Sequence, residues 1–309
     1  MTPLDQAAAD YVTLRRRMGF KFEEASELLA DFVSHLLDGG KSVITIQAAV
    51  DWAQSSGRHS NWWAKRLSIV RGFATYMAAL EPDAGHQIPH HGLVPPRRQR
   101  ATPFIYAPGD VVQLMKACRE LPSTWWALTV EVAVGLLAVT GMRVGELVRL
   151  DVGDLDWAAG VLTVRHSKFG KSRLVPLQPT AVAAVREYVG RRAQRWSYRP
   201  TSALLVSTSG ERLRYDSFHR TFRRLVREVG LQHPTTPKPP RVHDLRHTFA
   251  VSSLLGWYRS GDNVAARMHL LSAYLGHNDP TDTYWYLSAT PELMGLVAER
   301  LEPIEEPRP

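Results

Sequence analysis

Apolar side chains recur at every third or fourth position along most of the chain, the spacing of one face of a helix. Residues 22–37 follow this spacing and end in a Gly-Gly pair, which predicts a helix there. Thr45 can cap a short helix, and Ser60 or Asn61 can cap a longer one that ends before Pro82. The pattern therefore predicts that the first part of the chain is helical.

The helical pattern stops at residues 86–103, which contain four prolines and three arginines and predict an extended basic linker. We therefore expect one domain at residues 1–88, a linker at 89–104 and a second domain at 105–309. The helices predicted in the second domain span residues 108–121, 125–150, 180–196, 217–229, 242–258, 264–275, 280–289 and 291–301.

Two short β-rich segments, residues 161–164 and 173–177, lie on either side of a turn around Gly170. This arrangement predicts a β-hairpin. The expected fold class is therefore mostly α with a small antiparallel β-sheet (α+β), in two domains.

The composition excludes several classes of protein. The chain has 309 residues and a net charge of +8, and its single cysteine, Cys118, rules out an intramolecular disulfide. The longest apolar run, residues 125–139, is interrupted by Glu131 and is too short to span a bilayer. We therefore expect a cytoplasmic protein with no membrane partner, and the positive charge favours an anionic partner such as nucleic acid.

Two motifs place positively charged residues next to predicted elements, one at the end of an apolar helix and one in the hairpin turn. Residues 140–147 (TGMRVGEL) put Arg143 just beyond an apolar helix, with Glu146 three residues further on. The predicted hairpin turn carries Lys168 and Lys171, either of which can project into a ligand groove. Each motif also has a plainer interpretation: an ion pair on a helix surface, and lysines that serve only solubility.

Two further motifs lie towards the C-terminus. His243, Arg246 and His247 share one helix face, where two imidazoles and a guanidinium suit an anion. A metal site that includes His277 is the alternative, but Arg246 would repel the cation. After His277 comes a short aromatic helix that carries Tyr284 and Tyr286, a pattern also typical of core packing.

The four motifs contain two arginines, one lysine, two histidines and one tyrosine in a fixed order: Arg143, Lys168, His243, Arg246, His277 and Tyr286. This set resembles the tyrosine recombinases, the family of phage integrases and of Xer-like and Cre-like site-specific recombinases. The resemblance rests on T-G-x-R-x-x-E-L, the hairpin lysine, H-x-L-R-H-T, L-G-H and a tyrosine nine residues after that last histidine. It covers residues 108–301.

The resemblance implies the reaction. A tyrosine hydroxyl attacks a DNA phosphodiester, which leaves a 3′-phosphotyrosyl link and a free 5′-hydroxyl, and no cofactor or metal is needed. Tyr286 has the family spacing from His277. It is therefore the expected nucleophile in preference to Tyr284, which lies about 200° around a helix from it. Arg143 and Arg246 would stabilise the negative transition state.

The remaining roles also follow from the resemblance. His243 is the expected base and His277 the expected hydrogen-bond donor to the phosphate. Lys168 is the expected acid, with Lys171 as the alternative, and Glu146 is expected to support Arg143.

The resemblance further implies that residues 1–88 are a core-binding domain of the SAM-like type that holds double-stranded DNA. The cations expected to contact DNA are Arg97, Arg98, Arg100 and Lys171. Self-association on DNA is expected, as a tetramer in synapsis, with companion recombinases as further candidate partners.

We expect a nucleoid-associated enzyme that serves a mobile element. The alternatives are relaxation of DNA by a type IB topoisomerase and a DNA-binding relative without catalysis. A longer interval than usual separates Arg246 from His277, with a predicted turn at residues 261–263.

Overall fold

The computed structural model describes residues 2–57, 60–93, 103–165, 172–198, 201–234, 239–277, 279–288 and 290–301. The chain divides into two compact units, Met1–Ala101 and Thr102–Pro309. Each unit buries its own apolar side chains, so each is described by itself.

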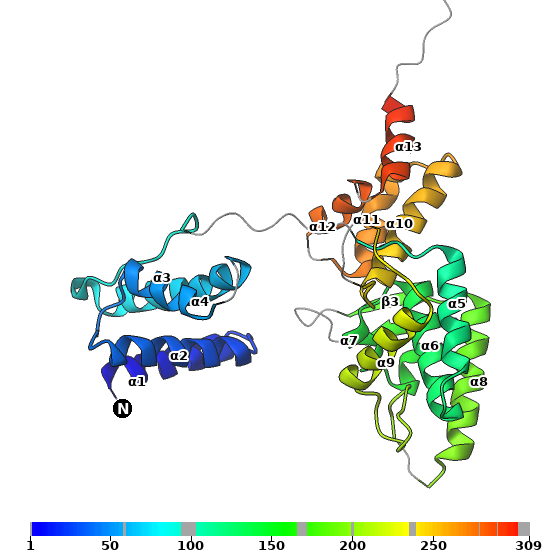
Figure 1. Ribbon diagram of the computed structural model, residues 1–309, viewed down its shortest axis with the longest axis horizontal. Coiled ribbons are helices and arrows are strands. Elements are labelled where there is room, and N and C mark those ends of the chain that lie inside the picture. Colours follow the sequence, from blue (N-terminus) through cyan, green and yellow to red (C-terminus); the bar gives the residue numbers. More distant parts are fainter. Residues whose placement is uncertain are drawn as a thin grey trace, which may run out of the picture. The chain divides into compact units, whose positions relative to one another are not determined.

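The N-terminal unit is helical (Figure 1). Its helices are α1 (Pro3–Arg17), α2 (Glu23–Asp38), α3 (Ile46–Ser55) and α4 (Ser60–Leu80), followed by the short 3₁₀ helix η1 (Pro82–Ala84). Thr45 caps α3 as predicted, because its Oγ1 accepts a hydrogen bond from the Ala48 amide at 3.1 Å. Phe32, Trp52 and Phe73 are fully buried at the centre of the unit.

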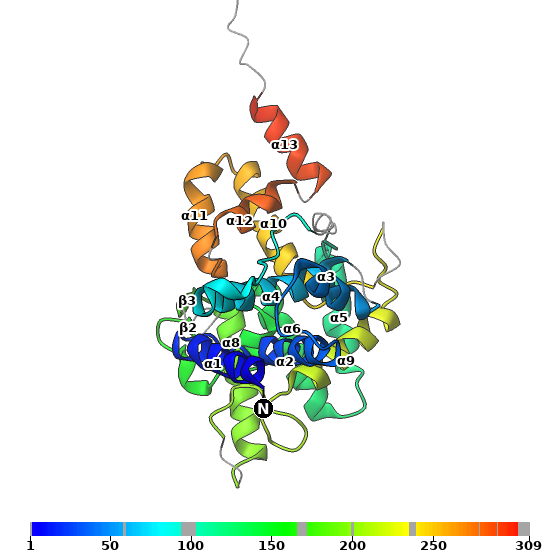
Figure 2. The same ribbon diagram turned by 90° about the vertical axis from the view of Figure 1, so that its left-hand side faces the viewer.

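The C-terminal unit is also mostly helical and carries a small sheet at its edge (Figures 1 and 2). Its α-helices are α5 (Pro108–Arg119), α6 (Thr124–Thr140), α7 (Val144–Leu147), α8 (Pro179–Arg195), α9 (Tyr215–Glu228), α10 (Asp244–Arg259), α11 (Val264–Leu275), α12 (Thr281–Tyr284) and α13 (Pro291–Leu301). Two 3₁₀ helices, η2 (Val152–Asp154) and η4 (Trp285–Ser288), complete the described helical segments.

The sheet is antiparallel, with strand order β1 (Leu155–Asp156), β2 (Val161–Val164) and β3 (Arg173–Pro176). The predicted hairpin is β2–β3, and its register pairs Val164 with Arg173. Strand β1 was not predicted, because two residues are too few to show an alternating pattern. The observed combination of helices and a small sheet agrees with the predicted fold class.

The prediction of one continuous helix at residues 125–150 was wrong, because the helix observed there is shorter. Helix α6 ends at Thr140, because Gly141 adopts the left-handed conformation with φ 58°. A Cβ atom at Gly141 would lie 2.7 Å from Cδ1 of Phe249, so the position has no room for a side chain. Four residues of the predicted helix instead form the separate helix α7 (Val144–Leu147).

The predicted helix at residues 280–289 also differs. It begins one residue later than the Asp279 cap implied, and it tightens from α12 into the 3₁₀ helix η4. Asp279 still contributes, because its Oδ1 accepts a hydrogen bond from the Thr281 amide at 2.9 Å.

The C-terminal unit contains two apolar clusters. The larger one joins α5, α6, α8, α9 and the sheet, and it includes Cys118, which is fully buried. The smaller one joins α10, α11, η4 and α13, and it includes Tyr286. The predicted turn at residues 261–263 connects α10 to α11. None of the described helices has the length and apolarity needed to cross a membrane.

Candidate active site

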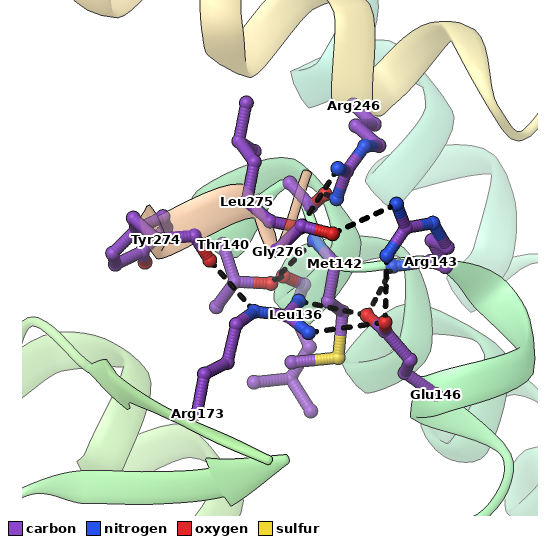
Figure 3. Close-up of polar contacts among 11 residues, drawn as sticks. Leu136, Thr140, Met142, Arg143, Glu146, Arg173, Arg246, Tyr274, Leu275 and Gly276 are labelled. Carbon is purple, nitrogen blue, oxygen red and sulfur yellow. Dashed lines mark hydrogen bonds and ion pairs between the residues drawn. The ribbon is translucent and has the colours of Figure 1, made fainter. Parts of the chain in front are cut away.

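Two helix ends form the frame of the site. Helices α6 and α11 each end at a left-handed glycine, Gly141 with φ 58° and Gly276 with φ 69°. The last carbonyls of a helix lack partners within the helix and carry partial negative charge, so they attract cations. Arg246 from α10 joins the two ends: its Nη1 donates to Gly141 O at 2.9 Å and its Nη2 to Leu275 O at 2.7 Å (Figure 3).

Arg246 is a buried charge in cationic surroundings. Only 2% of the residue is exposed. Burial, and then the charge of Arg143, lower the pKa of Arg246 to about 10, which still leaves it protonated at neutral pH. No carboxylate of the described residues lies within ion-pair distance of it. The site therefore contains a buried positive charge that no described carboxylate pairs with.

Arg143 directly precedes α7 and is held by Glu146. Its backbone amide donates to Glu146 Oε2 at 2.9 Å, and its Nη1 donates to Glu146 Oε1 at 3.0 Å. Its Nη2 donates to Gly276 O at 3.2 Å, so Arg143 also contacts the end of α11. The Arg143 side chain keeps 29% of its surface exposed, which leaves part of the guanidinium free for a ligand.

Glu146 is 3% exposed and is also bound by Arg173, the first residue of β3. Burial alone would raise the pKa of Glu146, but hydrogen bonding to Arg173 and the charges of Arg173 and Arg143 lower it to about 2. Glu146 is therefore a carboxylate that binds two arginines, Arg143 and Arg173.

The histidines lie around Arg246. His243 precedes α10, and its ring centroid lies 4.8 Å from that of His247. Desolvation of the ring, and then the charge of Arg246, lower the pKa of His243 from 6.5 to about 4, although the residue keeps an exposed face. His277 follows Gly276, and its Nδ1 lies 2.6 Å from Thr283 Oγ1.

The two candidate tyrosines have opposite environments. Tyr286 is 2% exposed, whereas Tyr284 is 53% exposed. The Tyr286 ring lies 5.5 Å from the ring of His247 and 6.1 Å from that of His277. Burial raises the pKa of Tyr286, while the charge of Arg246 and a hydrogen bond from it act in the opposite direction. The Tyr286 side chain therefore lies next to the Arg246 guanidinium.

The structure brings six of the residues singled out from the sequence into one site: Arg143, Glu146, His243, Arg246, His277 and Tyr286. The other five lie outside the described residues: Arg97, Arg98, Arg100, Lys168 and Lys171.

Sequence analysis missed Arg173. Its contacts, Glu146 and Tyr274, lie 27 and 101 residues away in the sequence. The available signal was a charged residue at the start of a predicted strand that packs against the core. Within the described ranges, no group of three or more His, Cys, Asp or Glu side chains is arranged to hold a metal ion.

Comparison with known proteins identifies this constellation. Residues 106–292 match the model of the phage integrase family. The chain belongs to the phage integrase family. Its motifs are those of the tyrosine recombinases, so the resemblance predicted from the sequence is confirmed.

Individual integrase relatives match over most of their length. The chain is 40% identical over 311 residues to y4rB of Sinorhizobium fredii, a protein named as an integrase/recombinase, and the match covers 98% of each chain. It is 32% identical over 250 residues to the tyrosine recombinase XerC of Azotobacter vinelandii, which covers 80% of this chain and 76% of that protein.

Solved structures of integrases share the fold. The Tn1549 transposon integrase in complex with transposon right end DNA matches with a TM-score of 0.68 and 19% identity, over 96% of this chain and 99% of that one. A lambda integrase tetramer bound to a Holliday junction matches with a TM-score of 0.62 and 18% identity, over 91% of this chain and 79% of that one.

Proposed function

We propose that this tyrosine recombinase cuts and rejoins double-stranded DNA at specific sites, with Tyr286 as the nucleophile. One observation carries the assignment of the nucleophile. The Tyr286 phenol is buried against Arg246, and Tyr284 is exposed. A buried tyrosine next to an uncompensated arginine is placed to attack a phosphodiester that the same arginine binds.

The reaction balances without a cofactor. The Tyr286 oxygen forms a bond to phosphorus while the bond from phosphorus to the 5′-oxygen breaks. The Tyr286 proton passes to His243, whose lowered pKa keeps its imidazole neutral and able to accept it at pH 7. Lys168, with Lys171 as the alternative, is the proposed donor of a proton to the departing 5′-oxygen.

Transition-state charge is stabilised by the two arginines. A guanidinium stays protonated and can donate to two phosphate oxygens, so Arg143 and Arg246 suit a phosphorane that carries more negative charge than the ground state. His277 is the proposed hydrogen-bond donor to a phosphate oxygen, and Glu146 fixes Arg143. Loss of one such donor typically slows a reaction by about 10²–10³-fold.

We also propose how the protein engages DNA. Residues 1–88 would act as a core-binding domain and residues 105–309 as the catalytic domain. The linker at residues 89–104 would contact phosphates through Arg97, Arg98 and Arg100. The related lambda integrase forms a tetramer on a Holliday junction, which supports self-association of this chain in synapsis.

The biological setting is proposed as a mobile element whose DNA this cytoplasmic enzyme moves. The structural match to a transposon integrase supports this setting. Companion recombinases are further candidate partners.

A nicked DNA substrate tests the assignment of the nucleophile, because loss of the short strand beyond the nick traps the covalent adduct. Wild-type protein and Tyr284→Phe should form the adduct, and Tyr286→Phe should form none on a denaturing gel. An adduct formed by Tyr286→Phe would contradict the assignment. Relaxation of supercoiled DNA without any strand exchange would favour the topoisomerase alternative.

A further inference from the structure

Three consecutive carbonyls at the end of α11 each accept a hydrogen bond from a different arginine. Tyr274 O accepts from Arg173 Nε at 2.7 Å, Leu275 O from Arg246 Nη2 at 2.7 Å, and Gly276 O from Arg143 Nη2 at 3.2 Å. Figure 3 shows the three guanidinium groups converging on this short segment. The proposed catalytic arginines therefore share one support with Arg173.

Arg173 also binds the second support of Arg143, which is Glu146. Its Nη1 donates to Glu146 Oε1 at 3.0 Å and its Nη2 to Glu146 Oε2 at 2.8 Å, the paired geometry in which a guanidinium holds a carboxylate most firmly. The Arg143 side chain donates to only one of these oxygens, Oε1. The two described acceptors of the Arg143 guanidinium are thus Glu146 Oε1, which Arg173 also contacts, and Gly276 O, two residues along the chain from the Arg173 contact Tyr274 O.

The backbone leaves space for this arrangement. Gly276 has φ +69°, and a Cβ atom built there would lie 3.0 Å from Arg173 Nη1 and 3.3 Å from its Cζ. The glycine of the L-G-H motif therefore ends the helix and also lets the Arg173 side chain lie against that end.

We propose that Arg173 is a positioning residue for the strand-transfer reaction: it holds Glu146 and the end of α11 so that Arg143 and Arg246 point at the scissile phosphate. This inference rests on the proposed function. The Arg173 side chain is only 10% exposed, and each of its three nitrogens donates to a protein acceptor, so it is proposed to act through the two arginines and not by binding DNA itself.

Charge explains why a second arginine is needed at Glu146. With Arg173 present, one carboxylate is shared between two guanidinium groups, so Arg143 keeps positive charge for a ligand. Without Arg173, the buried carboxylate would have Arg143 as its one ionic partner and would neutralise it. Removal of the carboxylate charge in the same protein should then release Arg143.

The test measures single-turnover formation of the covalent adduct on the nicked substrate at saturating DNA. Arg173→Met should slow adduct formation about 10²-fold, the typical effect of displacing a catalytic group by about 1 Å. DNA affinity should change by less than about threefold. Adding Glu146→Gln to Arg173→Met should restore about tenfold of the rate, because the charge that captures Arg143 is gone.

Arg212→Met is the matched control. Arg212 makes the same kinds of contact elsewhere: it donates to Val148 O at 3.3 Å, Leu150 O at 3.1 Å and Asp151 Oδ1 at 2.5 Å. Its loss should lower thermal stability and leave the rate of adduct formation unchanged.

Three results would overturn the inference: a wild-type rate for folded Arg173→Met, equal slowing by Arg212→Met, or losses that simply multiply when Glu146→Gln is added. If Arg173→Met does not fold, Arg173→Lys decides, since it keeps the charge but cannot make the paired contact. It should be about tenfold slower, and a wild-type rate would refute the inference. The proposed function fails separately, if wild-type protein forms no adduct.

Discussion

Each unit of this recombinase buries an arginine, and the two are built differently. In the N-terminal unit Arg66 is 4% exposed. Its Nη2 donates to Asp31 Oδ2 at 2.7 Å, and its guanidinium lies 3.7 Å from the centre of the Trp52 ring. A carboxylate and an aromatic face neutralise and cover the charge, so this arginine holds a helical core together.

Arg246 in the C-terminal unit is as deeply buried but has no comparable compensation. Its contacts are carbonyls at two helix ends, and its nearest charged neighbours include Arg143. Desolvating a charge without a counter-ion costs free energy. The difference supports the proposal that Arg246, whose charge no described carboxylate neutralises, has an anion as its partner.

The largest expected effect comes from replacing each arginine with glutamine. Arg246→Gln should slow adduct formation on nicked DNA by about 10²–10³-fold, because a donor to the transition state is lost. Arg66→Gln should leave that rate unchanged at saturating DNA and lower the free energy of unfolding of the N-terminal unit by about 2 kcal/mol. Adduct kinetics and thermal unfolding measure the two outcomes. Equal effects of both variants on the rate would remove the distinction.

The next effect is on pH dependence. The folded-state pKa of His243, about 4, lies below its ordinary value of 6.5, so the base remains neutral well into mild acid. Adduct formation at subsaturating DNA, which reports the free enzyme, should stay level from about pH 7.5 to 5.5 and fall only as pH approaches 4. A fall centred at pH 6.5 would contradict the lowering of the His243 pKa by desolvation and by the charge of Arg246.

Unfolding in acid should depend on the protonation of Glu146 and not on that of His243. The pKa of Glu146 is lowered from 4.5 to about 2, so its two ion pairs contribute fully above pH 4.5 and are lost as pH falls from 4.5 to 2. Circular dichroism across that range should show a loss of stability that Glu146→Gln reduces.

The smallest expected effect on the rate comes from replacing a left-handed glycine with alanine, compared between one such glycine in each unit. Gly276→Ala should cost about 1–2 kcal/mol of stability from its φ and slow adduct formation about tenfold, because the new Cβ displaces Arg173. Gly85 has φ +75° with nothing within 4 Å of its Cβ position. Gly85→Ala should therefore cost similar stability and leave the rate unchanged. A normal rate of adduct formation in Gly276→Ala would contradict the proposed role of Arg173 in positioning the catalytic arginines.

Many helices could be predicted from the sequence because neighbouring residues determine where these helices begin and end. Helical spacing and the Thr45 cap predicted α2, α3 and α4 of the N-terminal unit but not α1, and α11 and α13 begin and end where the apolar spacing predicted. The helix predicted at residues 125–150 was too long because the sequence alone does not show whether a glycine such as Gly141 lies inside a helix or ends it. The crowding by Phe249, 108 positions along the chain, is invisible in a local window.

The sequence by itself determined the chemistry. The type, order and spacing of Arg143, His243, Arg246, His277 and Tyr286 identified the family, because these motifs resemble those of the tyrosine recombinases. Only the tertiary structure decided which side chains support that chemistry. It buried Tyr286 and exposed Tyr284, joined Arg246 to two helix ends, and placed Arg173 on Glu146. These contacts join residues 27 to 105 positions apart, so they depend on how the helices and the hairpin pack and not on any local pattern.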